Sequence, residues 1–299
     1  MARIEEAHAT DVRTNAFADE DVGNIVSLEH VNVTIPDQAT ATLFYILGMG
    51  FTRDPYLNVG LDNMWVNVGE QQFHLPTRDP QVIPGHIGIV VPSLEALRAR
   101  LEAVQPRLAH TQFRYAVEDG YLAVTCPWGN QFRCYAPQPR FGDIVLGMPY
   151  VEFLTRPGTA AGIARFYAQV LLAPAHVEQD AQGVAAHVRI GTHQGLIFRE
   201  TDAALRPYDG HHIAIYVANF SAPYNYLKAR GLIMEDVTNH QFRFKDLVAP
   251  DSGELVFTLE HEVRSLRHPM YRRALVNRNP DQTLRHYRRG HDALIPFSG

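Results

Sequence analysis

The chain has 299 residues, of which 46% are apolar and 20% are charged, and this balance is typical of a soluble globular protein large enough for two domains. Its formal net charge of -5 argues against general binding to nucleic acid. No apolar run in the sequence approaches the length of a membrane span, so we expect no membrane partner.

Residues 1–26 are polar and acidic, and they lack the basic start and the apolar stretch of a secretory signal. We interpret them as a flexible N-terminal arm. The chain has only two cysteines, Cys126 and Cys134, which are too few for a disulfide framework. Both features favour the cytoplasm as the compartment.

A pattern of one strand, one helix and three further strands begins after this arm. Val31, Val33 and Ile35 alternate with polar residues in the segment LEHVNVTIP, which predicts a half-buried strand. A short helix is predicted over 40–47, and the segment MWVNVGEQQFHLP predicts two strands around a turn at 69–70. Together these elements form one βαβββ unit.

The same pattern recurs three more times, starting at the segments GHIGIVV, YVEFLTRP and HHIAIYV. In the second unit, Ser93 is a candidate N-cap for the helix, and the segment CPWGNQF predicts a hairpin turn. Two aromatic pairs stand at matching places in the first and third units: Phe44-Tyr45 and Phe166-Tyr167. Matches at one offset indicate internal repeats, so we interpret the chain as four related units.

This four-unit layout resembles the vicinal oxygen chelate (VOC) superfamily, which includes glyoxalase I, bleomycin- and fosfomycin-resistance proteins and the two-domain extradiol ring-cleaving dioxygenases. The motifs that carry the resemblance are HVNVTI, LFYILGMGF, FHLP, GHIGIVV and CPWGNQF, and the resemblance covers residues 28–261. It implies an α+β fold in which tandem βαβββ units pair into two half-open mixed-sheet barrels. Four units in one chain are most similar to the extradiol dioxygenases.

The implied organisation divides the chain into four parts. The arm over 1–26 precedes a first domain of two units over 27–140 and a second domain of two units over 147–262. An arginine-rich extension over 263–299 follows. It is too polar to form a core of its own, so we expect it to wrap a neighbouring subunit or to act as a lid, and we expect a homo-oligomer.

In the VOC family, metal ligands project from the strands of a unit pair into its barrel. The resemblance places such ligands at His30, His74 and His86. The family's usual terminal glutamate falls on Arg133 in the first half of the chain and on Phe257 in the second. Three imidazoles therefore remain as the implied donors for a divalent transition metal, Fe²⁺, Mn²⁺ or Zn²⁺.

Strand parity supports these three histidines independently. His30, His74 and His86 each share a strand face with polar or small residues, whereas the opposite face is apolar. We expect the polar faces to line a cup, with Gly88 leaving room for a ligand, and the apolar faces to pack on helices. A single histidine is more often hydrogen-bonded or exposed than metal-bound, so the predicted metal site depends on the convergence of all three.

Three further residues are candidate catalytic groups. Arg133 carries a permanent charge, and we expect it to pair with an anionic substrate. Glu152 and His212 occupy matching positions in the second half, where we expect them to meet and to perform acid–base work. The alternative for this pair is a buried hydrogen bond without a catalytic role.

These residues favour a metal-dependent enzyme that acts on a small oxygenated or aromatic compound, and the resemblance implies dioxygenase-like chemistry. One alternative is a metal-free small-molecule-binding protein on the same scaffold, which the missing terminal glutamates favour. Another is a cofactor-free isomerase, lyase or hydrolase that uses Glu152 and His212. The substrate is expected to be anionic or aromatic.

Overall fold

The computed structural model describes residues 20–57 and 62–294. Residues 1–19, most of the expected N-terminal arm, lie outside these ranges. The expected boundary at residue 26 is too late, because the first strand begins at Ile25 and the side chain of this residue is fully buried. Within the described ranges, no helix is both long and apolar enough to cross a membrane.

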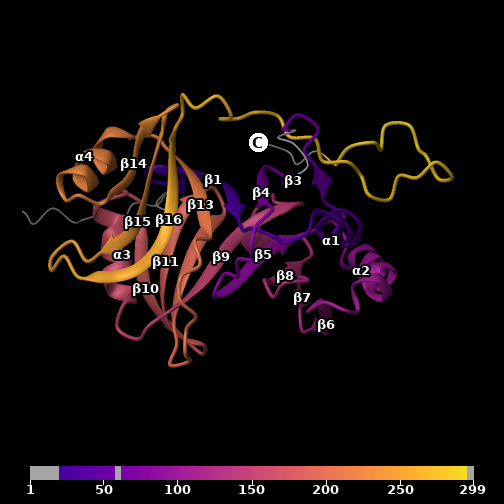
Figure 1. Ribbon diagram of the computed structural model, residues 1–299, viewed down its shortest axis with the longest axis horizontal. Helices are drawn as coiled ribbons and strands as arrows, with labels where there is room; N and C mark the ends of the chain where they lie inside the picture. The colour runs from indigo at the N-terminus through magenta and orange to yellow at the C-terminus, as the bar shows by residue number, and fades with distance from the viewer. Residues whose placement is uncertain (1–19, 58–61, 295–299) are drawn as a thin grey trace, which may run out of the picture.

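Two open, mixed sheets of eight strands each form the body of the protein (Figure 1). In the first sheet the strands lie side by side in the order β14-β15-β16-β13-β1-β4-β3-β2. Their bounds in chain order are β1 (Ile25–Asn32), β2 (Thr52–Arg53), β3 (Asn63–Val68), β4 (Gln71–Pro76), β13 (His212–Val217), β14 (Ile233–Thr238), β15 (Gln241–Val248) and β16 (Leu255–Ser265). This sheet joins the strands of the first and fourth units.

The second sheet has the order β10-β11-β12-β9-β5-β8-β7-β6. Its strands are β5 (Gly85–Val90), β6 (Arg114–Glu118), β7 (Tyr121–Thr125), β8 (Gln131–Tyr135), β9 (Gly147–Thr155), β10 (Ala175–Asp180), β11 (Gly183–Gly191) and β12 (Gln194–Glu200). This sheet joins the strands of the second and third units. The predicted α+β fold of paired βαβββ units is confirmed, and neither sheet is closed into a barrel.

Each unit has a helical segment after its first strand. These segments are α1 (Gln38–Ala41), which continues as the π-helix η2 (Thr42–Gly48), α2 (Leu94–Leu108), α3 (Ala160–Gln169) and α4 (Ser221–Ala229); a 3-10 turn, η3 (Pro139–Phe141), follows the second unit. The sequence explains α2 well, because Ser93 Oγ accepts a hydrogen bond from the N–H of Ala96 and a stripe with Leu97 and Leu101 is buried. The predicted N-cap at Ser93 is confirmed.

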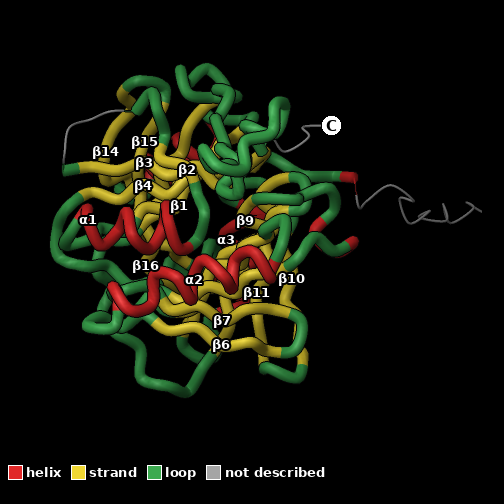
Figure 2. The backbone as a smooth tube through the Cα atoms, turned by 90° about the vertical axis from the view of Figure 1, so that its right-hand side faces the viewer, coloured by secondary structure: helices red, strands yellow, loops and turns green. Residues whose placement is uncertain are grey.

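The apolar faces of the two sheets turn toward each other, with η2, α2 and α3 between them (Figure 2). The ring centroids of Phe73 in the first sheet and Phe132 in the second lie 5.8 Å apart, and Tyr45 of η2 contacts both rings. Tyr167 of α3 bridges the two sheets in the same way. One continuous core therefore joins all four units, and the polar faces of the sheets point away from each other.

The units pair differently from the predicted order. The repeat order predicts units one and two together over 27–140, and units three and four together over 147–262. Instead, β1 of unit one pairs antiparallel with β13 of unit four, and β5 of unit two pairs with β9 of unit three. Alternation determines which face of a strand is buried but leaves open which strand lies beside it. Each sheet therefore takes half of its strands from each half of the chain.

The C-terminal extension packs against its own chain. Since β16 continues to Ser265, the extension begins after the expected boundary. It then crosses from the fourth unit to the first (Figure 1), where Asn277 exchanges hydrogen bonds of 2.8 and 3.0 Å with the backbone of Gly69. Nearby, Arg273 forms an ion pair of 2.6 Å with the buried Asp54. A neighbouring subunit as the target of the extension stays a prediction.

Because each sheet needs strands from both halves of the chain, neither half is expected to fold alone. Cutting the chain after Asp143, an exposed turn residue, separates β1 from β13 and β5 from β9. We expect residues 1–143 and 144–299 to aggregate when expressed singly, since each exposes unpaired strand edges, and to form a folded complex when co-expressed. Circular dichroism and size-exclusion chromatography measure this, and cooperative melting of residues 1–143 alone would contradict the observed pairing.

Candidate metal centre

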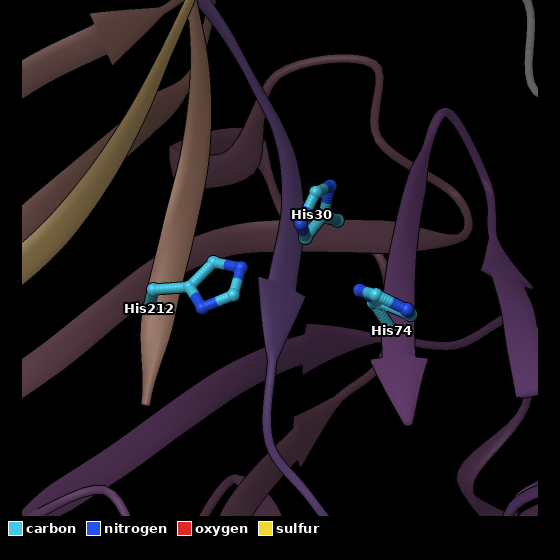
Figure 3. A group of neighbouring side chains, drawn as sticks. All are labelled: His30, His74 and His212. Carbon is cyan, nitrogen blue, oxygen red and sulfur yellow. The ribbon is translucent and has the colours of Figure 1, made fainter. Parts of the chain in front are cut away.

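Three histidines from neighbouring strands meet on the polar face of the first sheet. Asn32 of β1 pairs with His212 of β13 on one side and with His74 of β4 on the other. His30 precedes Asn32 by two residues and therefore lies on the same face. The strand register thus turns all three imidazoles to one side, and their ligand atoms lie within 4.8 Å of one another (Figure 3).

Aromatic contacts and burial hold these rings in place. The ring of Trp65 in β3 stacks on His74 at a centroid distance of 4.0 Å and meets His30 edge-on at 5.0 Å. His30 is 1% exposed and His212 is 9% exposed. Side chains packed in this way have little rotamer freedom, so the three imidazoles are preorganised for a common partner.

Several buried atoms at this site lack a partner. The Nε2 atoms of His30, His74 and His212 are buried without a hydrogen-bond partner among the described residues, and so is Oδ1 of Asn32, which lies between His74 and His212 in the register. Each buried polar atom left unpaired costs about 1–3 kcal/mol. Their accumulation at one place indicates a site built for a ligand, and converging imidazole nitrogens are the donors that transition metals prefer.

Burial keeps two of these imidazoles in the form that binds metal. It lowers the pKa of His74 to about 3 and also lowers the pKa of His212, and the neighbouring His30 adds to both shifts. A histidine must be neutral to donate a lone pair to an ion. Both side chains are therefore competent ligands at neutral and mildly acidic pH.

Glu29 fixes the ring of His30. A register shift in β1 between Leu28 and His30 interrupts the strict alternation, and it lets the carboxylate of Glu29 reach Nδ1 of His30. The same carboxylate pairs with Arg264 at 2.8 Å. Burial raises the pKa of Glu29, but His30 and Arg264 outweigh this effect and hold the pKa at about 2. With Nδ1 engaged, Nε2 is the nitrogen of His30 that remains for a ligand.

Two carboxylates of β16 complete the polar face beside His212. Glu260 is the cross-strand neighbour of His212, and its Oε1 lies 3.7 Å from Nδ1 of the imidazole. Arg243 of β15 donates hydrogen bonds to both Glu260, at 2.7 Å, and Glu262. Spacing from the preceding turn places the family's terminal ligand on Phe257, but that ring packs in the aromatic core. The carboxylates that face His212 are Glu260 and Glu262, whose Oε2 lies 3.9 Å from Nε2 of His212, and counting from the turn missed both.

His86, the third expected metal ligand, lies elsewhere. It stands on β5 in the second sheet, where its Nδ1 is 3.5 Å from Oε1 of Glu152 on β9. The expected set of His30, His74 and His86 is thus corrected, with His212 in place of His86. The physical reason is that unit one pairs with unit four rather than with unit two.

The expected meeting of Glu152 with His212 does not occur, because the two residues belong to different sheets. Glu152 instead accepts a hydrogen bond of 3.3 Å from Arg199. Arg133 lies on β8, also in the second sheet. The structure thus brings Arg133, Glu152 and His86 to one sheet, and it places His212 on the other sheet with the candidate metal ligands. Catalytic roles for Arg133 and Glu152 stay predictions.

Comparison of the sequence with protein-family models gives no match, and a search among curated proteins gives none either. Solved structures do match. Glyoxalase I from Zea mays superimposes with a TM-score of 0.55 at 12% identity, over 83% of this chain and 94% of that one. A "putative dioxygenase" from Bacillus subtilis superimposes with a TM-score of 0.53 at 13% identity, over 82% and 86% of the two chains. The chain therefore has the fold of the VOC superfamily, and identities this low show the fold alone.

Acid is expected to destabilise the protein through His86, which is held neutral in the second sheet. Burial, with Arg133 and Arg199 nearby, lowers the pKa of His86 from 6.5 to about 3. Between these values the unfolded chain binds a proton that the folded protein does not bind. The free energy of unfolding therefore falls as the pH falls, by about 1.4 kcal/mol per pH unit for this group.

Urea unfolding of the wild type and of His86→Gln at pH values from about 7 down to 4 measures this contribution. We expect the variant to lose that part of the slope while other buried histidines keep theirs. The same dependence of unfolding free energy on pH in both proteins would contradict a neutral, buried His86.

Proposed function

We propose that the protein is a metal-dependent enzyme whose centre is formed by His30, His74 and His212 and whose substrate is a small oxygenated or aromatic compound. The observation that carries the proposal is the convergence of three imidazoles whose Nε2 atoms are buried without a hydrogen-bond partner among the described residues. The fold shared with glyoxalase I from Zea mays supports it, because small-molecule enzymes use this scaffold.

The donor set fits a divalent transition metal. Three neutral imidazoles with a carboxylate close by suit Zn²⁺, Fe²⁺ or Mn²⁺. In this proposal Glu260 is the nearby carboxylate, since it is the cross-strand neighbour of His212 and Arg243 holds it at 2.7 Å. An ion held there would polarise a substrate oxygen or lower the pKa of a bound water molecule.

The residues around the centre have separate tasks in this proposal. Glu29 holds Nδ1 of His30 and so orients its ring toward the ligand. Trp65 stacks on His74 and covers one side of the group, which excludes water there. Asn32, between His74 and His212, offers its unpaired Oδ1 to a hydroxyl group of the substrate. These tasks are binding and orientation, and they suit a substrate that carries adjacent oxygens.

Among the reactions that such a centre supports we favour dioxygenase-like oxidation, because four βαβββ units in one chain match the architecture of the extradiol enzymes. The protein would then be an oxidoreductase. The small number of cysteines supports our expectation of a cytoplasmic protein, and we also expect a homo-oligomer. We do not propose a cofactor-free reaction by Glu152 and His212, because these residues lie in different sheets.

Metal binding is the direct test of this proposal. We expect the purified wild-type protein to hold, or to take up, about one equivalent of a divalent transition metal. His212→Ala is expected to lose this binding because it removes one of three ligands, whereas His86→Ala is expected to retain it. Inductively coupled plasma mass spectrometry before and after loading measures the stoichiometry.

Two results would end the proposal. One is a wild-type protein that takes up less than about a tenth of an equivalent of Zn²⁺, Fe²⁺ or Mn²⁺ under reducing conditions. The other is equal loss of binding in His212→Ala and His86→Ala. Circular dichroism of both variants shows whether they are folded.

Removing the carboxylate behind His30 is expected to weaken the metal site without abolishing it. Glu29→Gln keeps the shape of the side chain but removes the charge that supports His30, so we expect metal affinity to fall about 10- to 100-fold. Glu254→Gln, at an exposed position just before the start of β16, is the matched control and should leave affinity unchanged. Competition with a chromophoric chelator measures both, and identical affinities in the two variants would argue against the task assigned to Glu29.

A further inference from the structure

A second group of functional side chains lies on the polar face of the second sheet. We call it the aromatic–arginine cluster, and its six residues come from β7, β8, β9 and η3: Tyr121, Arg133, Tyr135, Arg140, Phe141 and Tyr150. The register places it there, since Arg133 and Tyr150 both pair with Gly88 of β5, one from each side. The three-histidine centre lies on the other sheet, whose polar face points away from this one.

The charged groups beside the cluster are paired among themselves. Arg199 donates to Glu152 at 3.3 Å and to the carboxylate of Asp180 at 2.8 and 3.1 Å. Nε2 of His86 is hydrogen-bonded to the hydroxyl group of Tyr150 at 3.0 Å. These groups therefore satisfy one another, and none of them forms an ion pair with Arg133.

Arg133 differs from these neighbours. It is half-buried, and across residues 20–57 and 62–294 it forms neither an ion pair nor a hydrogen bond. Its guanidinium lies over the ring of Tyr121, 5.4 Å from the centroid. A guanidinium has five donors in a planar fork that matches a carboxylate, and it keeps its charge when partly buried. A half-buried, unpaired arginine is therefore a position built for an anion.

The ring of Tyr121, which the guanidinium of Arg133 contacts, belongs to a group of linked aromatic side chains. Tyr150 lies across Gly88, where a Cβ atom would come within 2.3 Å of the ring, so the room that we expected at Gly88 is filled by this side chain. The hydroxyl groups of Tyr150 and Tyr135 are 2.9 Å apart, and the ring of Tyr135 lies 5.5 Å from that of Tyr121. The three tyrosines are thus linked to one another, and the ring of Tyr121 lies beside the cation.

We propose that the aromatic–arginine cluster is a second ligand site, which binds a small aromatic carboxylate. The carboxylate pairs with the guanidinium of Arg133, and the ring of the ligand packs against Tyr121 and Tyr150. An aliphatic acid loses the ring contacts and a neutral aromatic compound loses the ion pair, so the site selects for both features. Because the site belongs to the sheet without the three histidines, it is independent of the proposed metal centre.

Binding of benzoate to the full-length protein tests this site. Isothermal titration calorimetry is expected to show saturable binding of benzoate, with cyclohexanecarboxylate and benzyl alcohol each weaker by about tenfold or more. Arg133→Gln is expected to weaken benzoate binding by about tenfold or more, because it removes a charge-assisted pair. Arg98→Gln removes the same charge from the surface of α2, where Arg98 is 57% exposed, and should leave binding unchanged.

Two further measurements keep the outcome decisive. His212→Ala removes a proposed metal ligand and should leave benzoate affinity unchanged, which separates this proposal from the metal centre. Arg133→Lys keeps the charge without the planar fork and should bind with intermediate affinity, and thermal melting shows that each variant is folded. If Arg133→Gln does not fold, Arg133→Lys and a crystal structure of the wild type with benzoate decide the matter.

The proposal is overturned if benzoate does not bind at millimolar concentration, or if it binds equally well to the wild type and the folded Arg133 variants. Loss of binding in His212→Ala would overturn it too, because the ligand would then occupy the first sheet. Density for a carboxylate at hydrogen-bond distance from the guanidinium of Arg133 would support it.

Discussion

The structure depends on one apolar layer that both sheets share. Phe73 and Phe132, from different sheets, are in ring contact, and η2, α2 and α3 fill the space around them. The central strands of both sheets have one mainly apolar and one mainly polar face, so burying both sheets against the same layer sends their polar faces in opposite directions. This constraint creates two separate polar surfaces in one chain, and it explains why residues from all four units are needed for a single core.

The candidate metal ligands stand out because the charged side chains around them are already paired with one another. On the first sheet, three carboxylates, Glu29, Glu260 and Glu262, form ion pairs with two arginines, Arg243 and Arg264, so each of these charges has at least one partner of opposite sign. Buried charges without such partners would be far more costly. His30 and His212 contact this network through Glu29, Glu260 and Glu262, but the Nε2 atoms of all three imidazoles have no hydrogen-bond partner among the described residues. Paired charges thus surround neutral imidazole nitrogens that lack hydrogen-bond partners, and a metal ion would complete this arrangement.

The two polar faces show how one repeated unit can support different chemistry. In the first sheet the central strands β1 and β13 carry His30 and His212, whereas in the second sheet the corresponding strands β5 and β9 carry His86 and Glu152. In the second sheet, His86 is hydrogen-bonded to Tyr150, and Glu152 accepts a hydrogen bond from Arg199. No imidazole nitrogen of this pair is therefore left for a common ligand. Arg133, a cation on the same sheet, forms no ion pair or hydrogen bond with the part of the chain that the structure describes. The same backbone thus presents the candidate metal ligands on one side and the proposed anion-binding arginine on the other.

The sequence by itself determined the βαβββ unit, its fourfold repetition, the buried face of each strand, the cap at Ser93, and His30 and His74 as residues of a polar face. These features depend on local alternation and spacing, which a single chain segment contains. Only the tertiary structure decided that unit one pairs with unit four, that His212 replaces His86, and that Glu260 rather than Phe257 faces the histidines. Partner choice depends on how all four units pack on one core, and a shift of one residue in register exchanges the two faces of a strand. Alternation in β16, where Glu260 and Glu262 flank the buried His261, indicated the correct face locally, whereas counting from the preceding turn led to Phe257.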